Sequence, residues 1–210
     1  SDPKWDNFGN IRVINEDIIS PNAGFNTHSH SNMEIITVVI KGSITHRDSL
    51  NNFGKIHEDE VQVMSAGTGI SHSEKNEEND FCKLFQIWIF PKKENIKPHY
   101  DQISLKEKLW DNLIFDYNGG QNNILFINQD ISLWRCKYKP IKEKKLPLKI
   151  KKYNWIQIIE GNLLLKSKDS NSNISLSNGD GLGFEINDVK GISIETETEV
   201  DFLLFSMPYL

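Results

Sequence analysis

Short runs of β-branched and aromatic residues recur along the whole chain, and Gly, Asn and Asp separate them. These runs cover residues 11–14, 34–40, 61–64, 84–90, 124–127, 133–138, 155–159, 163–165, 192–194 and 202–205. Many short strands at this spacing are typical of β-sandwiches and β-barrels rather than of βαβ units. The pattern therefore predicts an all-β chain.

One segment departs from this pattern. Ser104-Leu105-Lys106-Glu107 has the form of a capping box, and the apolar residues Leu109, Trp110 and Leu113 follow it. A capping box before an apolar run marks the start of a helix. The sequence thus predicts a short helix at most, over residues 104–113.

The chain also repeats itself. Residues 38–44 resemble residues 156–163, and each segment reads as a strand, a tight turn at Gly42 or Gly161, and a returning strand. Glu60 opens another apolar run 18 residues after Gly42, and Asp180 lies in a similar place 19 residues after Gly161. Two copies of one small β-barrel explain this self-similarity. We expect one barrel in residues 1–105 and the other in residues 106–210.

Composition narrows the class of protein. The 210 residues include 11 Phe, 5 Tyr and 5 Trp, which excludes a wholly disordered chain. The net charge of −5 argues against a dedicated nucleic-acid binder, because such domains are strongly basic. Two cysteines, Cys82 and Cys136, are too few for a disulfide scaffold and read as small core residues.

The apolar runs are also too short for the ~18 residues of a membrane span, and residues 1–5 do not begin a signal peptide. We therefore expect a soluble cytoplasmic protein with no membrane partner.

Two short motifs carry candidate chemistry. His28 and His30 are separated by one residue, as are His72 and Glu74, so on a strand each pair points to one face. The Gly-rich bend at residues 66–69 can turn the chain so that His72 faces back into a barrel. Three imidazoles and one carboxylate suit a divalent transition metal and leave coordination positions open.

The repeat provides an internal comparison for these motifs. Projecting His28 and His30 into the second copy gives Pro147 and Lys149, and projecting the second motif gives Ile192 and Ile194. None of these residues is a usual metal ligand. The sequence therefore predicts a metal site in the first barrel and none in the second.

At this point the residues resemble a known family. Residues 27–37, 42–49 and 61–74 are similar to motifs of the pirin family, and residues 12–17, 86–89 and 203–208 agree with them. Pirins are bicupins, so the resemblance implies two tandem cupin barrels of jelly-roll type. It also implies one metal in the N-terminal cupin, bound by His28, His30, His72 and Glu74. Iron(II) is the usual metal, and the donor set also accepts nickel, copper, manganese, cobalt or zinc.

The resemblance further implies a bacterial pirin-like protein that acts as a monomeric quercetin 2,3-dioxygenase. A flavonol-like aromatic substrate and O2 would meet at the metal, with Glu74 as both ligand and catalytic base. The alternative is a non-catalytic protein of the same family, in which the metal senses redox state and regulates binding to a protein partner.

Two further residues leave the ligand set open. Glu34 lies an even number of residues from His28 and His30, so it competes with Glu74 as the carboxylate ligand, although the pirin pattern favours Glu74. In its other interpretation, Glu34 accepts a hydrogen bond from a histidine N–H. His46 reads as a strand-surface residue, with a place in the pocket as the alternative.

Overall fold

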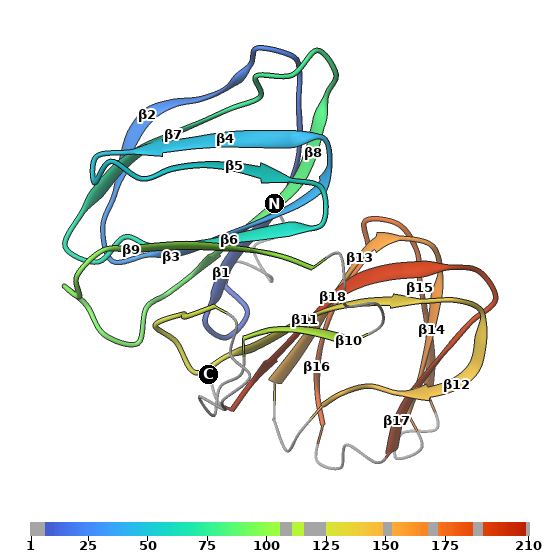
Figure 1. The fold of residues 1–210 in the computed structure, drawn as a ribbon. Coiled ribbons are helices and arrows are strands. Elements are labelled where there is room, and N and C mark those ends of the chain that lie inside the picture. The colour runs from blue at the N-terminus through green and yellow to red at the C-terminus, as the bar shows by residue number, and fades with distance from the viewer. Residues whose placement is uncertain are drawn as a thin grey trace. The chain divides into compact units, whose positions relative to one another are not determined.

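The computed structural model describes residues 7–105, 111–115, 125–148, 153–167, 172–186 and 191–208. Contacts between Cα atoms divide the chain into two compact units. The N-terminal unit comprises residues 1–107 with 124–129, and the C-terminal unit comprises residues 108–123 with 130–210. Each unit is built from antiparallel strands (Figure 1), so the all-β prediction is confirmed.

The N-terminal unit holds two sheets, with strand orders β1-β8-β3-β6-β9 and β2-β7-β4-β5. Its strands are β1 (Ile11–Ile19), β2 (Gly24–His30), β3 (Glu34–Lys41), β4 (Ser43–Asp48), β5 (Phe53–His57), β6 (Glu60–Ser65), β7 (Ile70–Lys75), β8 (Cys82–Ile89) and β9 (His99–Ser104). Alternate residues of β3 take opposite faces of the first sheet. Ile35 and Val39 belong to apolar clusters inside the barrel, on the face that also carries Thr37.

The C-terminal unit repeats this arrangement, with strand orders β10-β11-β18-β13-β16 and β12-β17-β14-β15. Its strands are β10 (Asp111–Phe115), β11 (Ser132–Tyr138), β12 (Ile141–Lys145), β13 (Tyr153–Glu160), β14 (Leu163–Ser167), β15 (Ser172–Leu176), β16 (Gly181–Glu185), β17 (Ile192–Thr196) and β18 (Val200–Met207). The order β2-β7-β4-β5 of the first unit returns as β12-β17-β14-β15 in the second. The internal repeat predicted from the sequence is therefore confirmed.

The two glycines that marked the repeat have the same structural role. Gly42 between β3 and β4 has a φ of 78°, and Gly161 between β13 and β14 has a φ of 89°. A Cβ on Gly42 would lie 2.9 Å from the carbonyl oxygen of Phe81, and one on Gly161 would lie 2.1 Å from that of Glu199. In both units only glycine lets this turn pass so close to the backbone that leads into the following strand, β8 in the first unit and β18 in the second.

The predicted helix is wrong where the structure describes it. Ser104 ends strand β9, residues 111–113 belong to β10, and residues 106–110 lie outside the described residues. Ile103 pairs with Val61 and Leu113 pairs with Trp134, so inter-strand hydrogen bonds override the local capping signal. The apolar run at 124–127 also forms no strand in its described part, residues 125–127.

Over the described ranges, the chain contains no helix that is long and apolar enough to cross a membrane.

Candidate metal centre

The candidate site lies on one face of the sheet β2-β7-β4-β5. The ladders pair His28 with His72 and His72 with Asp48, so these three residues form one row across the strands. In the next row of the β4–β7 ladder, His46 pairs with Glu74. Because side chains two residues apart on a strand share a face, all of these polar groups point into the barrel together.

Three imidazoles converge in this barrel. The ring centroids of His28 and His72 are 4.5 Å apart, those of His28 and His30 are 4.7 Å apart, and those of His30 and His72 are 5.1 Å apart. One nitrogen from each ring lies within 4.8 Å of the others. His72 is buried, whereas His28 and His30 are partly exposed. The structure therefore brings together the three histidines predicted from the sequence.

The nitrogens of these rings are arranged as a metal requires. His28 Nδ1 lies 2.7 Å from the carbonyl oxygen of Asn26, so Nδ1 carries the proton and Nε2 has a free lone pair. His28 Nε2 faces His72 Nε2 at 3.1 Å, and His30 Nε2 is buried with no hydrogen-bond partner. A divalent cation would satisfy these lone pairs, so the residues fit a metal.

The pKa values agree with this arrangement. Burial, and then the nearby histidines, lower the pKa of His72 to about 3. Burial and His28 lower the pKa of His30. Both rings are thus neutral near pH 7, and neutral imidazole is the form that binds a metal.

Glu74 is placed differently from the three histidines. It is buried and belongs to a second group with His46 and His72, in which one ligand atom from each residue lies within 4.8 Å of the others. Its Oε2 accepts a hydrogen bond of 2.7 Å from Gln86, and its Oε1 accepts longer ones from Thr37 and Gln62 at 3.3 and 3.5 Å. His72 therefore links the carboxylate to the other predicted ligands.

These surroundings act on Glu74 in opposite directions. Burial raises the pKa of its carboxyl group, while His46 and the hydrogen bonds lower it, and the net result is a raised pKa. Gln86, Thr37 and Gln62 occupy one row across the facing sheet. The barrel thus supplies a dedicated set of donors for this carboxylate.

Glu34 occupies the opposite face of β3 from Thr37, and so lies away from Glu74. Its Oε2 accepts hydrogen bonds from Ser65 Oγ at 2.5 Å and from the backbone N–H of Asn128 at 3.1 Å. Glu34 does not share a face with His28 and His30, although it lies an even number of residues from both. Asn32, with a φ of 49°, interrupts the strand between His30 and Glu34. Burial raises the pKa of Glu34 despite these hydrogen bonds, and no histidine is among its hydrogen-bond partners in the described chain.

The interpretation of His46 as a surface residue is wrong. His46 is fully buried, and its Nε2 lies 3.1 Å from Asp48 Oδ2. Its Nδ1 lies 3.5 Å from Nδ1 of His72. The sequence carried a signal for it, because His46 and Asp48 have the same one-residue spacing as the two metal-ligand motifs.

In the C-terminal unit, apolar residues fill the matching places. The β14–β17 ladder pairs Leu165 with Ile194, just as the β4–β7 ladder pairs His46 with Glu74. Carried through the ladders, the counterparts of His28, His30, His46, His72 and Glu74 are Leu146, Leu148, Leu165, Ile192 and Ile194, which all belong to one buried core cluster. In the described part of the second barrel, leucine and isoleucine therefore stand where the first barrel has its histidines and Glu74.

The counterpart of His28 in the second unit is Leu146 and not Pro147, as the count along the sequence predicted. Lys145 pairs with Ser193, so the position opposite Ile192 belongs to Leu146. An irregularity in the ladder between Ile141 and Lys144 shifts the register, and a count along the sequence cannot detect it.

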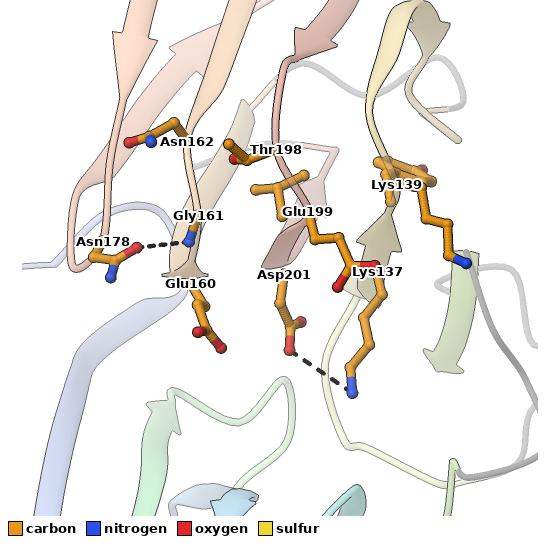
Figure 2. A pocket seen from close by; sticks show the side chains of 11 residues that line it. Lys137, Lys139, Glu160, Gly161, Asn162, Asn178, Thr198, Glu199 and Asp201 are labelled. Atoms are coloured by element: carbon orange, nitrogen blue, oxygen red, sulfur yellow. Dashed lines mark hydrogen bonds and ion pairs between the residues drawn. The ribbon is translucent and has the colours of Figure 1, made fainter.

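Two pockets differ in their chemistry. A pocket of about 310 Å³ lies beside His30 and is lined by Ser29, His30, Ser31, Ser49, Gly69, Ile70 and Ser71. A pocket of about 670 Å³ in the C-terminal unit is lined by residues of both charges but by no histidine (Figure 2). There Asp201 is already held by Arg135 at 2.8 Å and by Lys137 at 3.9 Å. Only the first of these two pockets adjoins candidate ligands.

Comparison with known proteins places the chain in a family. The Pirin family model matches residues 3–89, and the model of the quercetinase C-terminal cupin domain matches residues 118–207. The quercetin 2,3-dioxygenase of Escherichia coli K12 is 34% identical, over 99% of this chain and 86% of that protein. The chain belongs to the pirin family. The pirin-like protein of Caulobacter vibrioides is 55% identical over 91 residues, which are 43% of this chain and 39% of that protein.

Solved structures agree with this assignment. The crystal structure of YhhW from Escherichia coli matches with a TM-score of 0.90 and 33% identity, over 100% of this chain and 86% of that one. A second crystal structure, described as bacterial pirin YhhW in complex with nickel(II), matches with a TM-score of 0.88 and 32% identity, over 100% of this pirin chain and 87% of that one. Two cupin-like barrels are thus the fold that the chain shares with other pirins.

Proposed function

We propose that this pirin is a metal-dependent dioxygenase that opens quercetin-like flavonols with O2. His28, His30, His72 and Glu74 are proposed to hold one divalent transition metal, with iron(II) as the first candidate. The observation that carries the proposal is the convergence of three imidazoles whose Nε2 atoms are free or face one another. The similarity to a quercetin 2,3-dioxygenase supplies the substrate class.

The chemistry that such a metal supplies when bound is a lowered pKa of the substrate hydroxyl and the positioning of that hydroxyl next to O2. The protein contributes the rest. His28 and His30 are partly exposed, so a substrate can reach the proposed ligands at this end of β2.

Glu74 is the proposed base. Oε2 is held firmly by Gln86, whereas Oε1 accepts only the two longer hydrogen bonds, so Oε1 is the oxygen proposed to take the substrate proton. Because burial raises the pKa of this carboxyl group, it is a stronger base than a carboxylate in water.

Iron-loaded protein incubated with quercetin tests the proposal. We expect flavonol absorbance to fall while O2 is consumed, and we expect elemental analysis to find about one metal ion per chain. His30→Ala should abolish both metal retention and turnover, and His57→Ala, which changes an exposed histidine outside the site, should leave both unchanged. Metal binding without O2 consumption on any flavonol would contradict the dioxygenase and favour the regulatory alternative.

A further inference from the structure

We propose that Asp48 and His46 are positioning residues that fix the tautomer of His72. They act as a chain of hydrogen bonds that puts the His72 proton on Nδ1 and leaves Nε2 free for the metal. The inference rests on the metal site of the proposed function, and it does not depend on which substrate is used.

The chain begins at a carboxylate that is held in one orientation. Asp48 Oδ1 accepts hydrogen bonds from the backbone N–H groups of Leu50 and Asn52 at 2.9 and 3.0 Å, and Oδ2 accepts one from Asn52 Nδ2 at 2.9 Å. All three of these partners are N–H donors, so both oxygens of Asp48 act as acceptors. An ionised carboxylate can only accept hydrogen bonds.

His46 is the second link. Because Asp48 Oδ2 only accepts, the His46 Nε2 atom 3.1 Å away must carry a proton, and in the tautomer that has this proton alone the Nδ1 atom is an acceptor. The ring of Tyr100 stacks on His46 with centroids 4.7 Å apart and an angle of 29° between the planes. Gly54, which pairs with His46, makes room for this stack, because a Cβ there would lie 2.0 Å from the Tyr100 hydroxyl oxygen.

His72 completes the chain. Its Nδ1 lies 3.5 Å from the acceptor Nδ1 of His46, so the His72 proton belongs on Nδ1. His28 reaches the same state by a different route, because the carbonyl of Asn26 accepts from its Nδ1. Hydrogen bonds of this kind commonly set the tautomer and orientation of metal-bound histidines.

The fixed tautomer prevents a competing interaction. With its proton on Nε2, His72 would donate directly to His28 Nε2, which is only 3.1 Å away. The proton would then occupy His72 Nε2, and the hydrogen bond would occupy the lone pair of His28 Nε2. Neither nitrogen would be free for the metal. The Asp48–His46 pair therefore keeps the two histidines from binding each other.

Asp48→Asn is the sharpest test because it keeps the shape of the side chain. The asparagine amide can donate to His46 Nε2, which moves the His46 proton to Nδ1 and reverses the chain. We expect long-range ¹H–¹⁵N spectra of the metal-free protein to show His72 protonated on Nδ1 in the wild type and on Nε2 in the variant. Ni²⁺ affinity, measured against a competing chelator, should fall by about 10- to 100-fold.

A second pair of variants separates the hydrogen-bond chain from simple packing. In His46→Gln, the amide can donate to Asp48 and accept from His72, so Ni²⁺ affinity should stay close to that of the wild type. His46→Leu fills similar space without these bonds and should lose affinity as Asp48→Asn does. His57→Gln serves as the exposed control.

The results decide the inference either way. Wild-type His72 protonated on Nε2, or Ni²⁺ binding in both Asp48→Asn and His46→Leu as tight as in the wild type, would overturn it. A wild type that binds no Ni²⁺ would refute the proposed metal site, while the spectra would still report the tautomer. Failure to consume flavonols would affect only the proposed reaction.

Discussion

Acid should destabilise the metal-free protein through His72 in particular. The ring is 1% exposed, and its pKa falls from an ordinary 6.5 to about 3 in the folded state. Between these two values the unfolded chain binds a proton at this residue that the folded chain does not. The free energy of unfolding must therefore decrease as the pH falls through this window.

The size of the effect follows from the window. Well inside it, each pH unit costs about 1.4 kcal/mol, but at pH 6.5 only half of the unfolded chains carry this proton. A change from pH 6.5 to about pH 4.5 should therefore remove about 2 kcal/mol through His72 alone. Glu74 acts in the opposite direction, because a raised carboxyl pKa makes the folded chain bind its proton more strongly in acid. A comparison between variants isolates the histidine from the other groups.

Urea unfolding followed by tryptophan fluorescence supplies this comparison. Metal-free wild type should lose about 2 kcal/mol more than His72→Gln over this pH range, because glutamine does not titrate. The exposed-histidine variant His57→Gln controls for a general effect of losing one imidazole, and it should follow the wild type. Equal pH dependence in wild type and His72→Gln would refute the burial argument.

Two further predictions concern other parts of the chain. Burial, and then Glu74, raise the pKa of the Cys82 thiol to about 12. A thiol reagent at pH 8 should therefore leave Cys82 unmodified in native protein and label it after unfolding. Rapid labelling of Cys82 in native protein would contradict this. Gly179→Ala meets no atom within 4 Å and should cost only the backbone strain of a positive φ, about 1 kcal/mol. In Gly161→Ala the new Cβ would also lie 2.1 Å from a backbone carbonyl oxygen, so the free energy of unfolding should fall by more than in Gly179→Ala. Equal losses in the two variants would contradict this.

Much of the fold could be predicted because its signals are local. The turn glycines Gly42 and Gly161 fall between matching apolar runs, so the repeat is visible in the sequence. The one-residue spacing of His28 with His30 likewise fixes their common face as soon as that segment is a strand. Such features depend only on neighbouring residues.

Other features depend on contacts between distant segments. The one-residue spacing of His46 and Asp48 puts both side chains on one face, but no local pattern shows that Tyr100, more than fifty positions further along the chain, stacks on His46. The face taken by Glu34 depends on the left-handed residue Asn32, which interrupts the strand. The predicted helix fails for the same kind of reason, since pairing with a distant strand outweighs a local start signal.

The apolar core of the C-terminal barrel shows which residues must change together when a barrel has no metal site. If only one ligand were replaced, the remaining imidazoles would keep their lone pairs in a dry interior with no cation to satisfy them, and buried unsatisfied polar groups are costly. A barrel with an incomplete set of ligands is therefore less stable than one with a complete metal site or one with an apolar core. The leucines and isoleucines of the second barrel avoid this cost because they carry no polar atoms. We therefore expect each barrel of such a pair to hold either a complete set of ligands or an apolar core, and intermediate sets to be unstable.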